Sequence, residues 1–149
     1  MATELWLDDL HLGHRFCTDV YDLTADDIIE FATKWDPQPF HLSDETAQDT
    51  FFHGLAGSGW HTAAITMRLL VTSGIALACG IIGASGEVAW PTATRPGDRL
   101  HVEGEVVGVH TSKSSPNRGF VTIAYDTVNH DGEVRQSSKT RLLVFAKPR

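Results

Sequence analysis

The sequence predicts an α+β fold in which a strongly curved antiparallel β-sheet wraps around a buried α-helix. Two observations lead to this prediction: a long apolar helical segment in the first half of the chain, and a run of strand-like segments in the second half. A helix that is apolar nearly all round has to be covered, and the sheet supplies that cover. We expect one domain over residues 1–149, because the chain has no linker, internal repeat or low-complexity tract.

The first expected helix has clear ends. Thr24 and Asp27 have the spacing of a capping box, and apolar residues follow at helical intervals, so a helix should occupy residues 25–35. The segment Asp36-Pro37-Gln38-Pro39 should end this helix, because proline lacks an N–H donor and restricts the residue before it. His41 should then lie in an extended stretch.

The other elements follow from apolar periodicity. The long apolar helix should run over residues 55–72 and begin at His53-Gly54. Alternating apolar and polar residues predict strands at 14–22, 87–90, 99–110, 119–129 and 133–146. A polar loop over 111–118 and a tight turn over 129–132 should connect the last three strands into a meander.

Composition excludes several classes of function. With 12 Lys and Arg against 19 Asp and Glu, the net charge is −7, and nucleic-acid binding is not expected. Cys17 and Cys79 form neither a zinc-ligand pair nor a disulfide framework, and the histidines have no partner at metal-ligand spacing, so we expect no metal site. The N-terminus has no signal-peptide pattern, which favours the cytoplasm. The apolar stretch 63–84 contains Arg68 and several glycines, so no membrane span is expected.

Asp36 and His41 are the strongest candidates for chemistry. A carboxylate and an imidazole on a turn fixed by two prolines can point at one water molecule and divide acid and base roles. A helix that starts at His53-Gly54 would offer unpaired N–H groups to a substrate oxygen. The alternatives are structural: Asp36 caps a turn, His41 is an ordinary hydrogen-bonded residue, and Gly54 only permits a tight turn.

The Asp-x-x-Pro-x-His motif at residues 36–41, followed by His53-Gly54, resembles the MaoC-like dehydratase family, the (R)-specific enoyl-CoA hydratases with a hot-dog fold. Further matching segments are Trp90-Pro91, Arg95-Pro96-Gly97-Asp98 and Ser112-Lys113-Ser114. The resemblance implies that Asp36 and His41 are the catalytic pair and that the Gly54 amide binds the thioester oxygen. Many family members have Asn where this chain has Gln38.

We also expect substrate contacts from polar and basic residues, namely His53, Ser58, Thr62, Arg95, Lys113 and Arg118. The basic ones would contact coenzyme A phosphates, and the alternative is that they are solvated surface charges. No cofactor is expected, because coenzyme A belongs to the substrate. The resemblance also implies a homodimer or a larger homo-oligomer.

The expected activity is hydration of 2-enoyl-CoA, or the reverse dehydration of (R)-3-hydroxyacyl-CoA. Two alternatives remain open. An acyl-CoA thioesterase on the same fold would need a catalytic acid on the long helix, where residues 55–72 contain no Asp or Glu. A non-catalytic acyl-CoA-binding subunit would have no chemical need for both Asp36 and His41.

Overall fold

The computed structural model describes residues 3–149 and contains an antiparallel sheet of six strands. Their order is β1-β4-β5-β6-β3, and β2 pairs with the beginning of β4. The strands are β1 (Arg15–Cys17), β2 (Tyr21–Asp22), β3 (Ile82–Ala89), β4 (Arg99–Thr111), β5 (Arg118–Val128) and β6 (Val134–Phe145). The last three are the predicted meander. The expected strand over 14–22 divides into β1 and β2, and β3 begins earlier than predicted.

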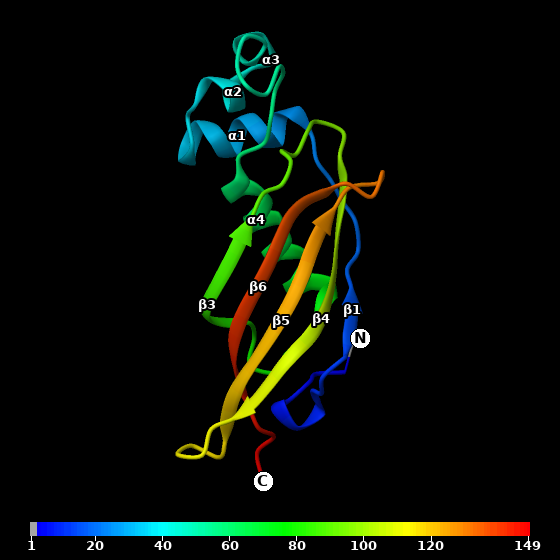
Figure 1. Ribbon diagram of the computed structural model, residues 1–149, viewed down its shortest axis with the longest axis vertical. Coiled ribbons are helices and arrows are strands. Elements are labelled where there is room, and N and C mark those ends of the chain that lie inside the picture. Colours follow the sequence, from blue (N-terminus) through cyan, green and yellow to red (C-terminus); the bar gives the residue numbers. More distant parts are fainter. Residues whose placement is uncertain (1–2) are drawn as a thin grey trace.

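The helices are α1 (Ala25–Trp35), α2 (Pro39–Leu42), α3 (Asp44–Ala47) and α4 (Gly59–Leu69), and a turn of π-helix (Leu70–Gly74) continues α4. A 3₁₀ turn (Leu7–Asp9) precedes β1. The sheet curves around α4, while α1, α2 and α3 gather at one end and the β4–β5 loop projects from the other (Figure 1). Among the described helices, none combines the length and apolar character that a bilayer crossing requires.

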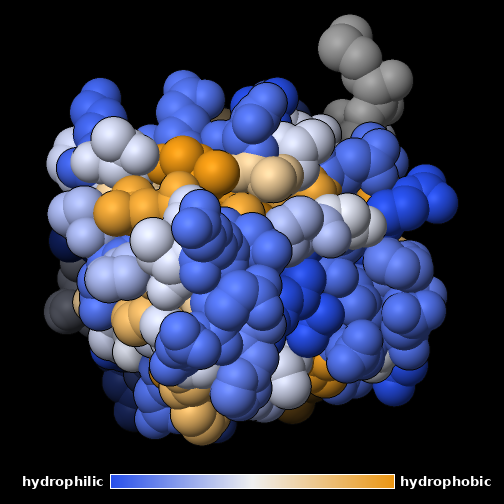
Figure 2. Space-filling model, turned by 90° about the horizontal axis from the view of Figure 1, so that it is seen from above, coloured by the Kyte–Doolittle hydropathy of each residue, from blue (hydrophilic) through white to orange (hydrophobic). Residues whose placement is uncertain are grey.

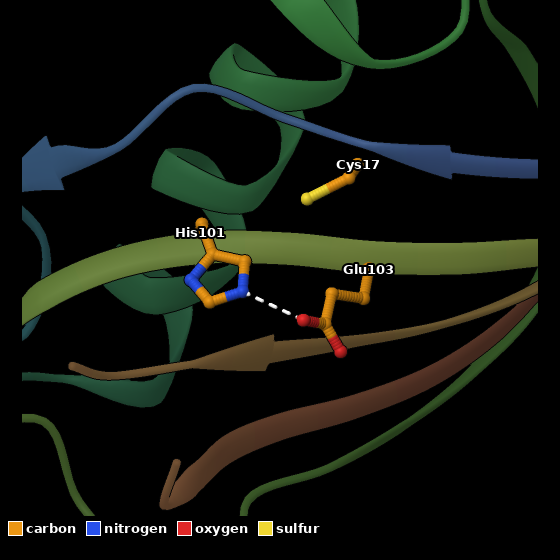
Figure 3. Close-up of side chains that lie close together, drawn as sticks. All are labelled: Cys17, His101 and Glu103. Carbon is orange, nitrogen blue, oxygen red and sulfur yellow. Dashed lines mark hydrogen bonds and ion pairs between the residues drawn. The ribbon is translucent and has the colours of Figure 1, made fainter. Parts of the chain in front are cut away.

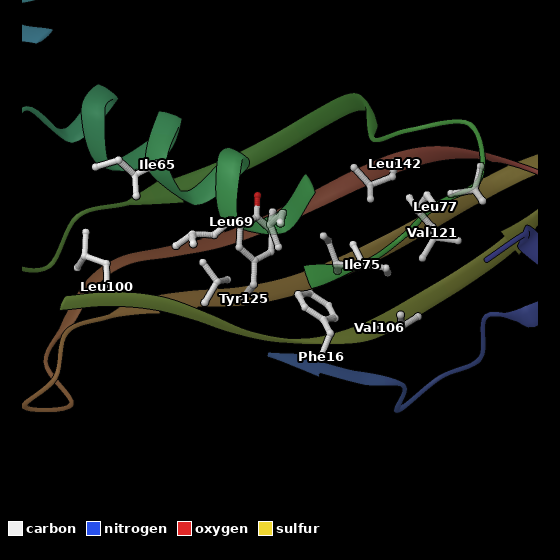
Figure 4. Packing of buried hydrophobic residues seen from close by; sticks show 14 of the residues in the cluster. Phe16, Ile65, Leu69, Ile75, Leu77, Leu100, Val106, Val121, Tyr125 and Leu142 are labelled. Atoms are coloured by element: carbon white, nitrogen blue, oxygen red, sulfur yellow. The ribbon is translucent and has the colours of Figure 1, made fainter. Parts of the chain in front are cut away.

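The core lies between α4 and the inner face of the sheet, where buried aliphatic side chains of helix and strands meet (Figure 4). Ile65 and Leu69 from α4 belong to it, together with Leu100 from β4 and Ile123 from β5. Inner positions alternate with outer ones along each strand, as the pleat requires. An extra residue in β4 between Val106 and Gly108 shifts its register against β5, and such bulges bend a sheet.

One expectation about α4 is wrong. The helix is not covered on every side within one chain, because Trp60, Met67 and Val71 on and just beyond α4 are 64%, 41% and 59% exposed. The physical reason is that a single sheet reaches only the face of the helix that carries its buried residues. Three large apolar side chains are therefore left uncovered on this face.

The start of α4 also differs from the prediction. The sequence placed it near Leu55, but the helix begins at Gly59 with Ser58 as its N-cap. Residues 55–58 run beside other segments instead: the Ala56 N–H donates to the Phe40 carbonyl, and the Gly57 N–H donates to the Thr94 carbonyl. These two bonds hold the backbone of residues 56 and 57 against other segments, so helical hydrogen bonding starts only from the Ser58 carbonyl.

Candidate functional site

Asp36 and His41 lie together, as their spacing suggested. Asp36 is the C-cap of α1, where its N–H donates to the Ala32 carbonyl at 2.8 Å. His41 lies in the short helix α2 rather than in an extended stretch, because Pro39 occupies the first turn, the helical position that proline tolerates. The Nε2 atom of His41 is 3.3 Å from Oδ2 of Asp36. The end of α1 and the short helix α2 therefore set this distance.

The Asp36 carboxylate is held at both oxygens. Ser58 Oγ donates to Oδ2 at 2.7 Å, and Gln38 Nε2 donates to Oδ1 at 2.6 Å. Burial raises the pKa of Asp36, but these hydrogen bonds and the nearby His41 outweigh it and leave the pKa below its usual value. Asp36 is therefore a carboxylate at neutral pH, and its side chain is 18% exposed, enough to meet a substrate or water.

The second side chain of the pair is fixed through its other ring nitrogen. His41 Nδ1 lies 2.6 Å from the Ala56 carbonyl oxygen, which can only accept, so Nδ1 carries a hydrogen. In neutral His41 the lone pair of Nε2 then faces the Asp36 carboxylate. Two acceptors at this distance require a hydrogen between them. Either a proton on Nε2 or a water that donates to both atoms supplies it.

The N-terminus of α4 adjoins the pair through Ser58, which is fully buried. Thr62 is the first residue of the helix whose N–H donates to a backbone carbonyl of the helix, that of Ser58. The N–H groups of Gly59 and Trp60 come earlier in the helix and have no intrahelical partner, which makes this end electropositive. Gly59 was not among the residues predicted for the site, although Ser58 before it is a preferred N-cap residue and could have located the helix start.

Gly54 does not lie at a helix start, so the predicted position of the helix-start amide was wrong. Its carbonyl accepts from Arg95 Nη1 at 3.0 Å, and a side chain at Gly54 would contact Asp44. The reason is that residues 55–58 are held in a non-helical segment by hydrogen bonds to Phe40 and Thr94, so that α4 begins only at Gly59. His53 is exposed and lies in this loop with a φ of 55°.

Arg95 is a structural residue in this arrangement. Its guanidinium donates to the carbonyls of Phe52, Gly54 and Leu55 at 2.8, 3.0 and 3.3 Å, and it is half-buried. The predicted phosphate contact would have to displace these bonds. Arg95 therefore anchors the loop that leads into α4.

The side chains of Ser58 and Thr62 have different surroundings. Ser58 is buried against Asp36, whereas Thr62 lines a cavity of about 120 Å³ beside the start of α4. Gly59 and Trp90 line the same cavity, and a side chain at Gly59 would lie 2.7 Å from the Trp90 ring. The glycine thus lets Trp90 pack against the helix start.

Lys113 and Arg118 are exposed in and beside the β4–β5 loop. This loop lies at the end of the sheet opposite α1 and α2 (Figure 1). One chain therefore does not bring these two side chains to the Asp36–His41 pair.

Comparisons with known proteins agree with this fold. Residues 12–129 match the family model described as a MaoC like domain. A MaoC-like dehydratase from Rhodospirillum rubrum is 54% identical, with a TM-score of 0.96 over 97% of this chain and 99% of that chain. The R-hydratase PhaJ1 from Pseudomonas aeruginosa is 21% identical, with a TM-score of 0.77 over 97% and 88% of the two chains, and shares the hot-dog fold. The uncharacterized protein YdeM from Bacillus subtilis is 29% identical over 124 residues, which is 83% of this chain and 86% of YdeM.

Proposed function

This chain belongs to the family of MaoC-like domains, and we propose on that premise that it hydrates 2-enoyl-CoA thioesters and dehydrates (R)-3-hydroxyacyl-CoA thioesters. The observation that carries the proposal is the pair of proton acceptors, Asp36 Oδ2 and His41 Nε2, that face each other at 3.3 Å beside a helix N-terminus. The (R) configuration follows from the family resemblance.

The pair has the right parts to activate water. A water that lies beside both atoms, at hydrogen-bond distance from each, donates one hydrogen to the Asp36 carboxylate and the other to Nε2 of neutral His41. As the water oxygen bonds to C3 of the enoyl group, one of its protons passes to the pair. The π electrons move onto the thioester oxygen, and the pair returns a proton to C2. The sum is one H and one OH added, and dehydration is the reverse.

The negative charge that develops on the thioester oxygen needs a hydrogen-bond donor to stabilise it. The Gly59 N–H at the start of α4 is unpaired within the helix and adjoins Ser58, the residue that bonds Asp36. We assign the oxyanion contact to this amide in place of Gly54, because a helix N-terminus stabilises developing negative charge. The cavity that Thr62 and Trp90 line is the place for the acyl group. Acid, base and oxyanion donor all come from the chain, so the proposed reaction needs no cofactor beyond the substrate's coenzyme A.

A homodimer completes this proposal. All residues of β3 are exposed, and β3 is an edge strand. Exposed apolar side chains of Trp60, Met67 and Val71 follow one face of α4 and its π-helical extension, and Figure 2 shows a band of hydrophobic side chains across the upper end of the molecule. Pairing of two β3 edges about a twofold axis would remove both open edges and cover apolar surface.

Such pairing would also bring the β4–β5 loop of one copy toward the site of the other. A twofold axis perpendicular to the sheet reverses the second copy, so its β4–β5 loop points toward the end that carries Asp36 in the first. Lys113 and Arg118 of one copy would then be available to coenzyme A phosphates at the site of the other.

The test is incubation with crotonyl-CoA while enoyl absorbance and free thiol are both followed. We expect loss of absorbance without thiol release, because water attacks C3 and the thioester stays intact. Thiol release equal to substrate loss would identify a thioesterase. No turnover across a panel of trans-2-enoyl-CoA chain lengths would favour the non-catalytic subunit.

A further inference from the structure

Three potential metal ligands meet on the outer face of the sheet. Cys17 ends β1 and pairs in register with Glu103 of β4, and His101 precedes Glu103 by two residues on the same face. Leu100 and Val102 alternate with them and are fully buried in the core. The ligand atoms of the three outer side chains all lie within 4.8 Å of one another. Figure 3 shows these side chains side by side.

We propose that Cys17, His101 and Glu103 form a binding site for a divalent transition-metal cation, with zinc as the best match. A thiolate, an imidazole and a carboxylate are the ligands that zinc takes, at about 2.3, 2.0–2.1 and 2.0–2.2 Å respectively. Ligand atoms at such distances from one ion lie roughly 3–4 Å apart. His101 Nε2 and Glu103 Oε1 already lie 2.9 Å apart, and a rotation of the exposed Cys17 brings in the sulfur.

The hydrogen bond in the metal-free site does not oppose binding. His101 Nε2 and Glu103 Oε1 share a hydrogen at this distance, and a cation takes its place between the same two atoms. Three protein ligands leave one tetrahedral position for water, as in zinc sites that stay open. Binding therefore releases protons, from the thiol and from any imidazolium.

The charges around the cluster favour a cation. Asp126 of β5 faces Glu103 in register and lines the same solvent-open groove as Cys17. The two arginines that lie two residues away along β1 and β4 are paired with other carboxylates: Arg15 with Glu105 at 3.7 Å and Arg99 with Asp22 at 3.1 Å. The groove gives an ion an entry path to the ligands.

The site is separate from the Asp36–His41 pair. The cluster lies on the outer face of β4, whereas α4 packs on the inner face through residues such as Leu100. No metal site was expected from the sequence, because neither the cysteines nor the histidines show metal-ligand spacing along the chain. Strand register, which sequence spacing does not reveal, brings the three side chains together.

Cobalt(II) added to the reduced, full-length protein tests the proposal without reference to its catalytic function. We expect a thiolate-to-cobalt charge-transfer band in the near ultraviolet that one equivalent of zinc abolishes. Cys17→Ser should remove the band, and Cys79→Ser, which changes the other exposed cysteine, should retain it. His101→Gln and Glu103→Gln should each weaken zinc binding at least about tenfold.

Three results would each overturn the proposal: no charge-transfer band in the wild-type protein, a band that survives Cys17→Ser, or a band lost in Cys79→Ser. Isothermal titration with zinc supplies the dissociation constants. Circular dichroism of each variant shows whether the sheet is intact, so that a lost band is assigned to the lost ligand.

Discussion

Two of the imidazole–carboxylate pairs in this chain, one inner and one outer, differ in both contact distance and exposure. The inner pair, His41 and Asp36, is separated by 3.3 Å and its side chains are 6% and 18% exposed. The outer pair, His101 and Glu103, is separated by only 2.9 Å, yet its side chains are 25% and 63% exposed. The pair with the shorter contact is thus the more exposed one. Distance alone does not mark a catalytic pair.

What separates the two pairs is how firmly other groups hold them. Asp36 accepts from Ser58 and Gln38, and His41 is fixed through the Ala56 carbonyl. Within residues 3–149, Glu103 has His101 as its single side-chain partner. A fixed pair is organised in advance for proton transfer, whereas an exposed pair adapts its side chains at low cost to an incoming ion.

The largest effect is expected from breaking the inner pair. Asp36→Asn and His41→Gln should each lower kcat at least about 10²-fold, because each replaces a base with an amide that does not take up a proton from water. Crotonyl-CoA hydration measures this, and circular dichroism should be unchanged. The matched control is Asp131→Asn, in a wider exposed pair with His130 at 3.7 Å. Near wild-type turnover in either inner variant would contradict the roles assigned here.

Ser58→Ala should have the next largest effect. The hydrogen bond from the Ser58 hydroxyl lowers the pKa of the Asp36 carboxyl, so its loss should raise that pKa. The decline of activity on the acid side of the pH profile should therefore move to higher pH. A bond to a charged group contributes about 1.5–3 kcal/mol, which corresponds to a decrease in kcat/KM of roughly tenfold or more. The pH profile of kcat/KM measures both changes. An acid limb that stays in place would show that Ser58 does not act through Asp36.

Gln38→Ala should shift the acid limb of the kcat/KM pH profile to higher pH as well, but by less than Ser58→Ala does. The hydrogen bond from the Gln38 side-chain amide to Asp36 is 2.6 Å long. Gln38 is exposed, however, so a water molecule can replace the lost donor in the variant. We expect a change in kcat/KM smaller than that of Ser58→Ala, measured over the same pH range. An equal or larger shift would mean that the exposed bond, and not the buried one, sets the ionisation of Asp36.

The smallest effect is expected from the outer pair in the absence of metal. Glu103→Gln should change the free energy of unfolding by about 1 kcal/mol or less, because exposed ion pairs contribute little. Urea denaturation measures this value. A loss of several kcal/mol would show that the outer pair is as firmly built into the fold as the inner one.

The sequence by itself determined the elements whose signals are local. Thr24 and Asp27 cap α1 as their spacing predicts, and the two prolines after Asp36 end it. The position of the Asp36 carboxylate at a helix end was therefore readable from residues close together in the chain. The three long strands were readable as well, because alternation of apolar side chains reflects the pleat of each strand alone.

The tertiary structure decided whatever depends on residues far apart. The start of α4 moved to Gly59 because amides of residues 56 and 57 bond to Phe40 and Thr94, and this moved the helix-start amide away from Gly54. Ser58 became a partner of Asp36, and Cys17 met His101 and Glu103, only through packing and strand register. A local pattern records which conformation a segment prefers, but the partners of its side chains are set by the free energy of the whole packed chain.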